Sequence, residues 1–403
     1  MYTPHGHLTY CTNIHAGESW PDHFKALKEN IQVVKKRISA NSPMGIGLRL
    51  SHLAGTVLIE KEQLDAFKSW LQENDLYVYT LNGFPYGGFH RTRVKDQVHA
   101  PDWTTRERVD YTKRNFNILK ELLPEGMDGG QSTSPLSYRH WFKTAETLKD
   151  ATKKATEHIA EIAIFLAQIN EYEGKLLHLD IEPEPDGILE TGEEFLAWYN
   201  NDLIPVAADL IAAEFNIDRH SATAILKKHI GLCYDVCHFA IGYEPHETII
   251  DKVKAEGIVI GKIQISAALK GNLDVEPDDR KQVTDSFAHF NESTYLHQVV
   301  ARTKNGGLIR YPDLPEALHD AGNKNVSEWR AHFHVPIAAK DYGVLLSTQD
   351  AIQEVLAIQK RHPFTNHLEV ETYTWEVLPS ALKLPLTDSI IREMEWVIDF
   401  LQS

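Results

Sequence analysis

The chain has 403 residues, 42% of them apolar, and a formal net charge of −16. Such a charge repels a phosphate backbone and argues against a nucleic-acid partner. No apolar run reaches the roughly 18 residues of a membrane span, and the N-terminus has no secretory pattern. The three cysteines are too few for a disulfide framework. These features together predict a cytoplasmic protein without a membrane span.

Strand-like and helix-like segments alternate along the whole chain, which is typical of βα units around a parallel sheet. The predicted strands are residues 8–15, 44–51, 76–81, 127–134, 175–182, 230–235, 261–266 and 368–374. The predicted helices are residues 22–37, 61–74, 105–123, 144–172, 195–215 with a break at Pro205, 246–256 and 388–401. This order predicts an α/β fold, a (β/α)8 TIM barrel, as a single domain over residues 1–403.

Two connections are too long to be simple loops. Residues 82–104 follow the third strand and are rich in glycine, proline and aromatic side chains. Residues 269–331 follow the seventh strand and form a predicted insertion over the barrel mouth. Loops of this length usually act as lids or walls of a site, and the alternative is an elaboration that only covers the mouth.

Carboxylates end two of the predicted strands. Asp235 closes an apolar run, and His238 follows three residues later. Glu182 ends the fifth strand, where Pro183 stops the strand pattern. Chemistry in a TIM barrel is placed at the carboxyl ends of the strands. The alternative for the first motif is an aspartate that caps the next turn beside a core histidine.

Two further segments alternate with a period of two, so their polar residues share a face. Glu369 and Glu371 lie on one face of the last strand, and His332 and His334 on one face of residues 330–337. Carboxylates and imidazoles from distant strands are what a mixed oxygen and nitrogen metal site requires. Without a cation, carboxylates gathered at one place would also repel each other, and this repulsion would raise the pKa of at least one of them. A divalent metal relieves the repulsion and is therefore favoured.

These motifs resemble the xylose isomerase-like TIM barrel superfamily, which includes sugar and sugar-phosphate isomerases and epimerases and endonuclease IV. Glu182-Pro183 is similar to the first metal ligand of this family, and Asp235-Val236-Cys237-His238 to its Asp-x-Cys-His motif. Glu371-Thr372 is similar to the glutamate of the last strand. The resemblance implies that Glu182, Asp235 and Glu371 bind a divalent metal, and that His238 faces the substrate or a second metal.

One position departs from the family. Gln264 stands where the family usually has a metal-binding histidine, and an amide oxygen is a weaker ligand than imidazole. His332-x-His334 resembles the Asp-x-His pair of endonuclease IV and would restore an imidazole. We expect Gln264 to offer its carbonyl oxygen or to orient a water, and His334 to approach the site more closely than His332. The predicted metal ligands are Glu182, Asp235, Gln264, His334 and Glu371, around Mn²⁺, Zn²⁺ or Mg²⁺.

Further polar residues are predicted to contact the substrate: His15, Asn82, His90 and His238. The alternative for His15 is a loop histidine that makes a backbone hydrogen bond. Glycine- and proline-rich loops also carry polar and aromatic residues for packing alone, which is the alternative for Asn82 and His90.

The resemblance implies a sugar or sugar-phosphate isomerase or epimerase with a small polar substrate, in which Glu182 and Glu371 transfer the proton. Residues 8–20, 82–87, 334–336 and 368–375 further resemble the EboE-type metabolite traffic proteins. That resemblance implies a secondary-metabolite pathway with partners from the same gene cluster. Two alternatives stay open: a binding or traffic protein that has lost turnover, which Gln264 favours, and an endonuclease IV-like metal-dependent hydrolase, which the extra histidines favour.

Overall fold

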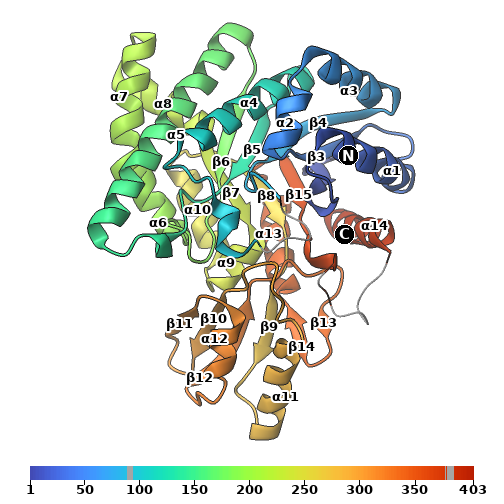
Figure 1. Cartoon of the computed structure of the whole chain (residues 1–403), viewed down its shortest axis with the longest axis vertical. Coiled ribbons are helices and arrows are strands. Elements are labelled where there is room, and N and C mark those ends of the chain that lie inside the picture. Colours follow the sequence, from blue (N-terminus) through green and yellow to red (C-terminus); the bar gives the residue numbers. More distant parts are fainter. Residues whose placement is uncertain (89–93, 377, 379–384) are drawn as a thin grey trace.

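The computed structural model describes residues 1–88, 94–376, 378 and 385–403. Its centre is a barrel of parallel strands surrounded by helices (Figure 1), which confirms the predicted TIM barrel. The barrel strands in the described residues are β2 (Gly6–Tyr10), β3 (Met44–Arg49), β4 (Leu76–Asn82), β5 (Gly129–Thr133), β6 (Leu177–Ile181), β7 (Ile230–Asp235), β8 (Ile260–Ile265) and β15 (His367–Val370).

Neighbouring strands pair in sequence order from β3 to β8, and β15 joins β8 to β2. A parallel bridge between Cys11 and Gly47 brings β2 and β3 together and nearly closes the barrel. The short β1 (Tyr2–Thr3) adds to β2 in the antiparallel direction. Every residue of β7 is buried, since barrel strands are covered on both faces. This burial explains why the strand sequences are apolar runs that end in polar residues.

The predicted helices are all present in the described residues. They are α1 (Trp20–Ile38), α3 (Lys61–Glu73), α4 (Arg106–Leu122), α5 (Ala145–Glu173), α6 (Gly192–Trp198), α7 (Ile204–Phe215), α10 (His246–Ala255) and α14 (Leu386–Gln402). The break between α6 and α7 is a π-helical turn over Tyr199–Leu203. Pro205 lies in the first turn of α7, directly after this π-helical turn. The sequence did not predict α2 (His52–Leu58), α8 (Arg219–His229), α9 (Val236–Ile241) or α13 (Gln349–Arg361).

A second, antiparallel sheet lies between β8 and β15 in the chain and extends from the barrel at the bottom of Figure 1. Its strands are β9 (Leu269–Asn272), β10 (Val299–Thr303), β11 (Leu308–Tyr311), β12 (Val326–Ala331), β13 (Asp341–Tyr342) and β14 (Leu345–Ser347). The helices α11 (Pro277–Ala288) and α12 (Leu314–His319) belong to the same segment, and Phe287 of α11 packs edge-on against Trp329. The sheet therefore continues past residue 331, where the predicted insertion ended.

Among the described helices, none combines the length and the apolar composition needed to cross a bilayer. The three cysteines are buried and free.

A partly buried carboxylate behind α9 makes the stability of the fold depend on pH. Oε2 of Glu244 accepts a hydrogen bond from the backbone N–H of Gly192 at 2.9 Å. Burial, and secondarily nearby glutamates such as Glu190, raise the pKa of Glu244 from 4.5 to about 7. Because the folded pKa lies above the unfolded one, this group's contribution to stability is lost as the pH rises from about 4.5 through 7.

We expect Glu244→Gln to stabilise the protein by roughly 3 kcal/mol near pH 8 and to change its stability little near pH 4. Urea unfolding at both pH values measures this, and an equal effect at the two would contradict it.

Candidate metal centre

The carboxylates of Glu182, Asp235 and Glu371 meet at the carboxyl end of the barrel. They follow or end β6, β7 and β15, and all three residues are buried. One oxygen of each lies within 4.8 Å of the others, which is close enough for a shared ion. The structure thus brings together the three carboxylates that the strand ends predict.

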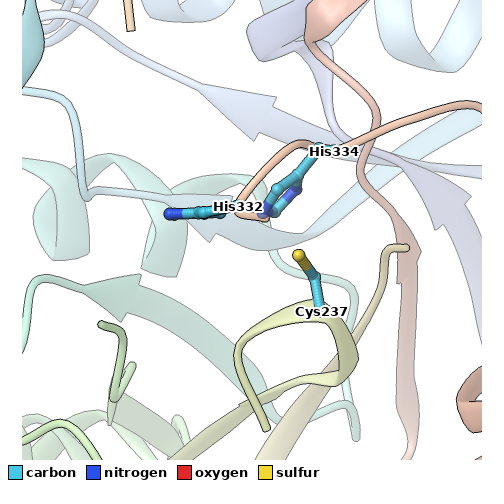
Figure 2. Close-up of side chains that lie close together, drawn as sticks. All are labelled: Cys237, His332 and His334. Atoms are coloured by element: carbon cyan, nitrogen blue, oxygen red, sulfur yellow. The ribbon is translucent and has the colours of Figure 1, made fainter. Parts of the chain in front are cut away.

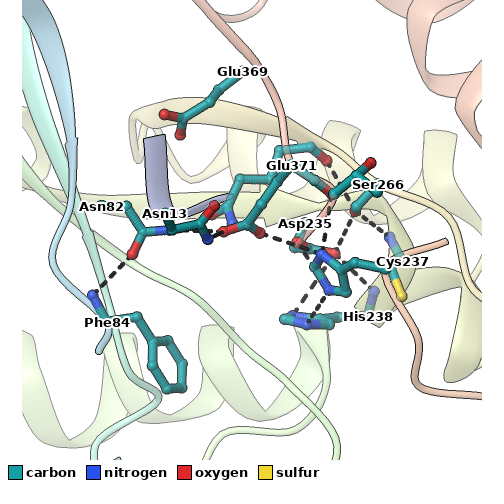
Figure 3. Close-up of polar contacts among 12 residues, drawn as sticks. Asn13, Asn82, Phe84, Asp235, Cys237, His238, Ser266, Glu369 and Glu371 are labelled. Atoms are coloured by element: carbon teal, nitrogen blue, oxygen red, sulfur yellow. Dashed lines mark hydrogen bonds and ion pairs between the residues drawn. The ribbon is translucent and has the colours of Figure 1, made fainter. Parts of the chain in front are cut away.

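Asp235 has one oxygen that caps a helix and one that does not. Its Oδ1 accepts hydrogen bonds from the backbone N–H of His238 at 3.0 Å and from Oγ of Ser266 at 2.8 Å (Figure 3). Its Oδ2 is buried and has no hydrogen-bond partner among the described residues. Asp235 is therefore the N-cap of α9, as the alternative interpretation expected, and it also offers a free oxygen to a ligand.

Glu371 is held by three amide groups. Its Oε1 accepts hydrogen bonds from Nδ2 of Asn13 at 2.8 Å and Nδ2 of Asn82 at 2.7 Å, and Oε2 accepts one from Nε2 of Gln264. Burial, then the neighbouring Asp235, raise the pKa of Glu371 to about 8. Asn82 thus orients a carboxylate, an arrangement that the sequence does not indicate. Its Oδ1 accepts a hydrogen bond from the backbone N–H of Phe84 at 3.2 Å.

Gln264 lies at the centre of this group, but in a different orientation from the expected one. Its amide nitrogen faces the carboxylates and donates to Glu371 and to Oε1 of Glu182, the latter at 3.3 Å. Its carbonyl oxygen accepts a hydrogen bond from the thiol of Cys233. The expectation that Gln264 offers its carbonyl oxygen is therefore corrected: the side chain acts as a donor that partly neutralises the carboxylates.

The carboxylate oxygens of Glu182 and Asp235 that accept no hydrogen bond favour a bound cation. Oε2 of Glu182 is buried without a hydrogen-bond partner among the described residues, as is Oδ2 of Asp235. Burial, then the charges of Glu371 and Asp235, raise the pKa of Glu182 well above its usual value. Buried carboxylates of this kind are satisfied by a proton or a metal ion. The donor set therefore fits a divalent metal.

Three imidazoles lie beside the carboxylates, on His238, His332 and His334 (Figure 2 shows the latter two beside Cys237 of α9). In each ring, Nδ1 faces a carbonyl oxygen and therefore carries the proton, which leaves the Nε2 lone pair free. The acceptors are O of Pro183 for His238 at 3.0 Å, Oε1 of Gln298 for His332 at 2.8 Å, and O of Glu371 for His334 at 3.3 Å.

The free nitrogens of these rings point at one another. Nε2 of His238 is 3.1 Å from Nε2 of His332 and 3.4 Å from Nε2 of His334. Two tetrahedral zinc ligands lie about 3.3 Å apart, since a zinc–nitrogen bond measures about 2.0–2.1 Å. Burial, assisted by the charge of His238, lowers the pKa of His332 well below its usual value. Burial likewise lowers the pKa of His334 to about 4. Neutral rings with converging lone pairs fit a second cation.

The other predicted residues lie in different places. His334 approaches the carboxylates, with Nδ1 at 3.4 Å from Oε2 of Glu371, whereas His332 groups with Glu184 and His238. Nε2 of His15 is hydrogen-bonded to the hydroxyl of Tyr10 at 2.9 Å, and the described lining of the cavity does not include His15. His90 lies outside the described residues.

The site opens into a cavity of about 60 Å³. Asn82 and the three imidazoles line it, together with the aromatic side chains of Phe84, Tyr295 and Tyr373. Two further lining residues, His99 and Glu184, form an ion pair at 3.0 Å between Nε2 and Oε1, and the sequence did not single them out. The cavity is smaller than the roughly 300 Å³ of a typical small-molecule pocket. A sugar-sized ligand therefore requires its walls to move.

Comparison with known proteins assigns the fold. Neither a protein-family profile nor a curated protein matches the chain. Among solved structures, a xylose isomerase-like TIM barrel protein from Mycobacterium smegmatis in complex with magnesium is similar, with 11% identity, a TM-score of 0.50, and coverage of 100% of this chain and 98% of that one.

Two further structures are similar at lower TM-scores. A xylose isomerase domain protein from Planctomyces limnophilus has 13% identity and a TM-score of 0.46, over 99% of this chain and 98% of that one. The IOLI protein with a bound zinc atom has 14% identity and a TM-score of 0.43, over 98% of each chain. The similarity to the structure from Mycobacterium smegmatis and the strand order of the barrel together assign a TIM-barrel fold to the chain.

Proposed function

We propose that the protein is a divalent-metal-dependent isomerase or epimerase acting on a small polyhydroxylated metabolite, such as a sugar or sugar phosphate. The observation that carries this proposal is the meeting of Glu182, Asp235 and Glu371. In this group, Oε2 of Glu182 and Oδ2 of Asp235 are buried and lack a hydrogen-bond partner in the described chain. The magnesium complex of the similar barrel from Mycobacterium smegmatis supports it.

The residues that would hold the metal are Glu182, Asp235, Glu371 and His334, and Mn²⁺, Zn²⁺ and Mg²⁺ suit this set. A bound cation of this kind polarises a substrate carbonyl, which makes the adjacent carbon–hydrogen bond more acidic. Gln264 would stand beside the ion as a hydrogen-bond donor to its carboxylate ligands.

Glu182 and Glu371 would move the proton. They come from β6 and β15, which are not neighbours in the barrel sheet, so that one carboxylate can take a proton from the substrate carbon and the other return it. Asn13 and Asn82 fix the direction of the Glu371 carboxylate, and a positioned group is what general acid–base catalysis needs. The aromatic walls would limit the access of bulk water to a bound substrate.

The cavity lining supports a small polar substrate. Asn82 and His238 supply polar groups and Phe84, Tyr295 and Tyr373 supply flat apolar faces, a combination suited to a sugar ring. Tyr295 comes from residues 269–331, the segment that we propose covers the mouth. The resemblance to EboE-type proteins supports a place in a secondary-metabolite pathway.

The test is proton exchange with solvent. The purified protein is incubated with aldoses, ketoses and their phosphates in deuterated water, after chelation and after return of Mn²⁺, Mg²⁺ or Zn²⁺. We expect metal-dependent uptake of deuterium at a carbon next to a carbonyl in at least one substrate. A co-purified metabolite that binds tightly but exchanges no proton would instead favour the binding or traffic protein.

One observation favours a second candidate, a metal-dependent hydrolase. Glu184, His238 and His332 form a second ligand set beside the carboxylates, and two-metal centres commonly catalyse hydrolysis. The charge of −16 argues against DNA as its substrate. Metal-dependent cleavage of a small phosphate ester without any proton exchange would favour this candidate.

A further inference from the structure

We propose a second, separate metal site at the amino-terminal end of the barrel, formed by Asp128, His178 and His367 and suited to zinc. Asp128 directly precedes β5, His178 is the second residue of β6, and His367 is the first residue of β15. Amino ends of parallel strands lie at the opposite end from the barrel mouth, so this site is independent of the proposed function.

The spacing of the three side chains fits coordination better than hydrogen bonding. Oδ2 of Asp128 lies 3.6 Å from Nε2 of His178 and 3.6 Å from Nε2 of His367. This separation is too long for a hydrogen bond. It is close to the roughly 3.3 Å between two tetrahedral zinc ligands. All three ligand atoms lie within 4.8 Å of one another.

The ring of His178 is already oriented for a metal. Its Nδ1 lies 2.8 Å and 2.9 Å from the two carboxylate oxygens of Asp180, which accept a hydrogen bond from its N–H. The Nε2 lone pair is then directed toward Asp128, an arrangement in which a carboxylate orients a ligating histidine. Asp180 is fixed in turn, since its carboxylate occupies the space where a side chain on Gly261 would begin.

The imidazole nitrogens that face Asp128 need a partner. Nε2 of His178 and Nε2 of His367 are buried and have no hydrogen-bond partner within the described part of the chain. Both rings are almost inaccessible to solvent, and the ring of His367 packs edge-on against Tyr79 at 4.8 Å. A buried polar atom without a partner is costly, and one cation would satisfy both nitrogens.

The site is also reachable and balanced in charge. The side chain of Asp128 is 27% exposed and lines a surface cavity of about 550 Å³, through which an ion and a water ligand can enter. The carboxylates of Asp128 and Asp180 together match the charge of a dication. Two imidazoles and one carboxylate form a ligand set typical of zinc. A metal here would join the starts of β5, β6 and β15.

The test is zinc content, measured by elemental analysis after chelation, reloading with Zn²⁺ and removal of the excess. The variants are Asp128→Asn and His367→Gln, each in the full chain. The control is His229→Gln, which also removes a buried imidazole near the start of β6, one whose Nδ1 bonds O of Leu177 at 2.6 Å. We expect both site variants to hold one zinc fewer per chain than the wild type, and the control to hold the same number.

Equal zinc content in wild type and folded Asp128→Asn would overturn the proposal. In that case His178 is an imidazolium shared by two aspartates, without a metal. Asp128→Asn is the decisive variant if His367→Gln does not fold, because Asp128 is partly exposed. Repeating the comparison in an Asp235→Asn background separates this site from the barrel mouth: the zinc lost with Asp128 should still be present there. A wild type whose zinc is removed completely by Asp235→Asn would likewise overturn the proposal.

Discussion

Replacing Glu371 with glutamine should reduce metal-dependent proton exchange by about 10²- to 10⁴-fold, the usual contribution of a positioned acid or base. Glutamine keeps the length of the side chain and an oxygen that can accept from Asn13 and Asn82. It removes the group that takes up a proton and one negative charge of the metal ligand set. The measurement is the rate of deuterium incorporation at saturating substrate and metal.

Glu244→Gln is the matched control for this prediction. Glu244 also has a carboxylate with a raised pKa, but this carboxylate accepts a hydrogen bond from Gly192 and is not part of the described cavity lining. This variant should exchange protons at the wild-type rate. Full exchange in Glu371→Gln with bound metal would contradict the role of Glu371, as would exchange that survives alanine at both Glu182 and Glu371.

Replacing Lys262 with methionine should destabilise the fold by about 3–5 kcal/mol, because it leaves a charge unpaired inside the barrel. Nζ of Lys262 lies 2.6 Å from Oε2 of Glu369, and both side chains are fully buried. Nζ also donates to O of Leu81 at 3.2 Å. Glu369 cannot reach water, because it fills the interior space left by Gly47, where a side chain would collide with Oε1.

The double variant Lys262→Met/Glu369→Leu should recover most of that loss, since a buried ion pair replaced by apolar residues of similar volume is often neutral or stabilising. Urea unfolding of the two single variants and the double variant gives the coupling energy between the residues. Additive destabilisation in the double variant would show that Lys262 and Glu369 act on stability independently, against this account.

The barrel could be predicted from the sequence because its strands are buried on both faces and read as short apolar runs. β7 is such a run, and α5 carries a continuous apolar stripe that ends at Gly174. The second sheet could not be predicted in this way. Its strands are short, and β11 has no buried residue, so it lacks a clear alternation. The same holds for β13 and β14, which lie beyond residue 331 and span only two and three residues.

The carboxylates of the site could be predicted because parallel strands place their ends together. Side-chain orientation could not, because it depends on tertiary neighbours. Gln264 turns its amide toward the carboxylates since Cys233 donates to its oxygen. Asn13 orients Glu371 from a short 3-10 turn and Gln298 orients His332 from a loop, both distant in sequence, and no local pattern marks them. The roles of His15 and His90 in substrate binding stay predictions.

The most direct test of a metal at the barrel mouth is the metal content of the purified protein, compared between wild type and Asp235→Asn. Asp235 belongs to the carboxylate group with Glu182 and Glu371, and also to the group with His238 and His334. Both proteins are stripped with a chelator, reloaded separately with Mn²⁺, Zn²⁺ and Mg²⁺, and analysed for bound ions per chain. We predict that Asp235→Asn holds at least one ion fewer than the wild type with at least one of the three metals. Equal metal content in the two folded proteins, with every metal offered, would contradict a metal centre at the barrel mouth.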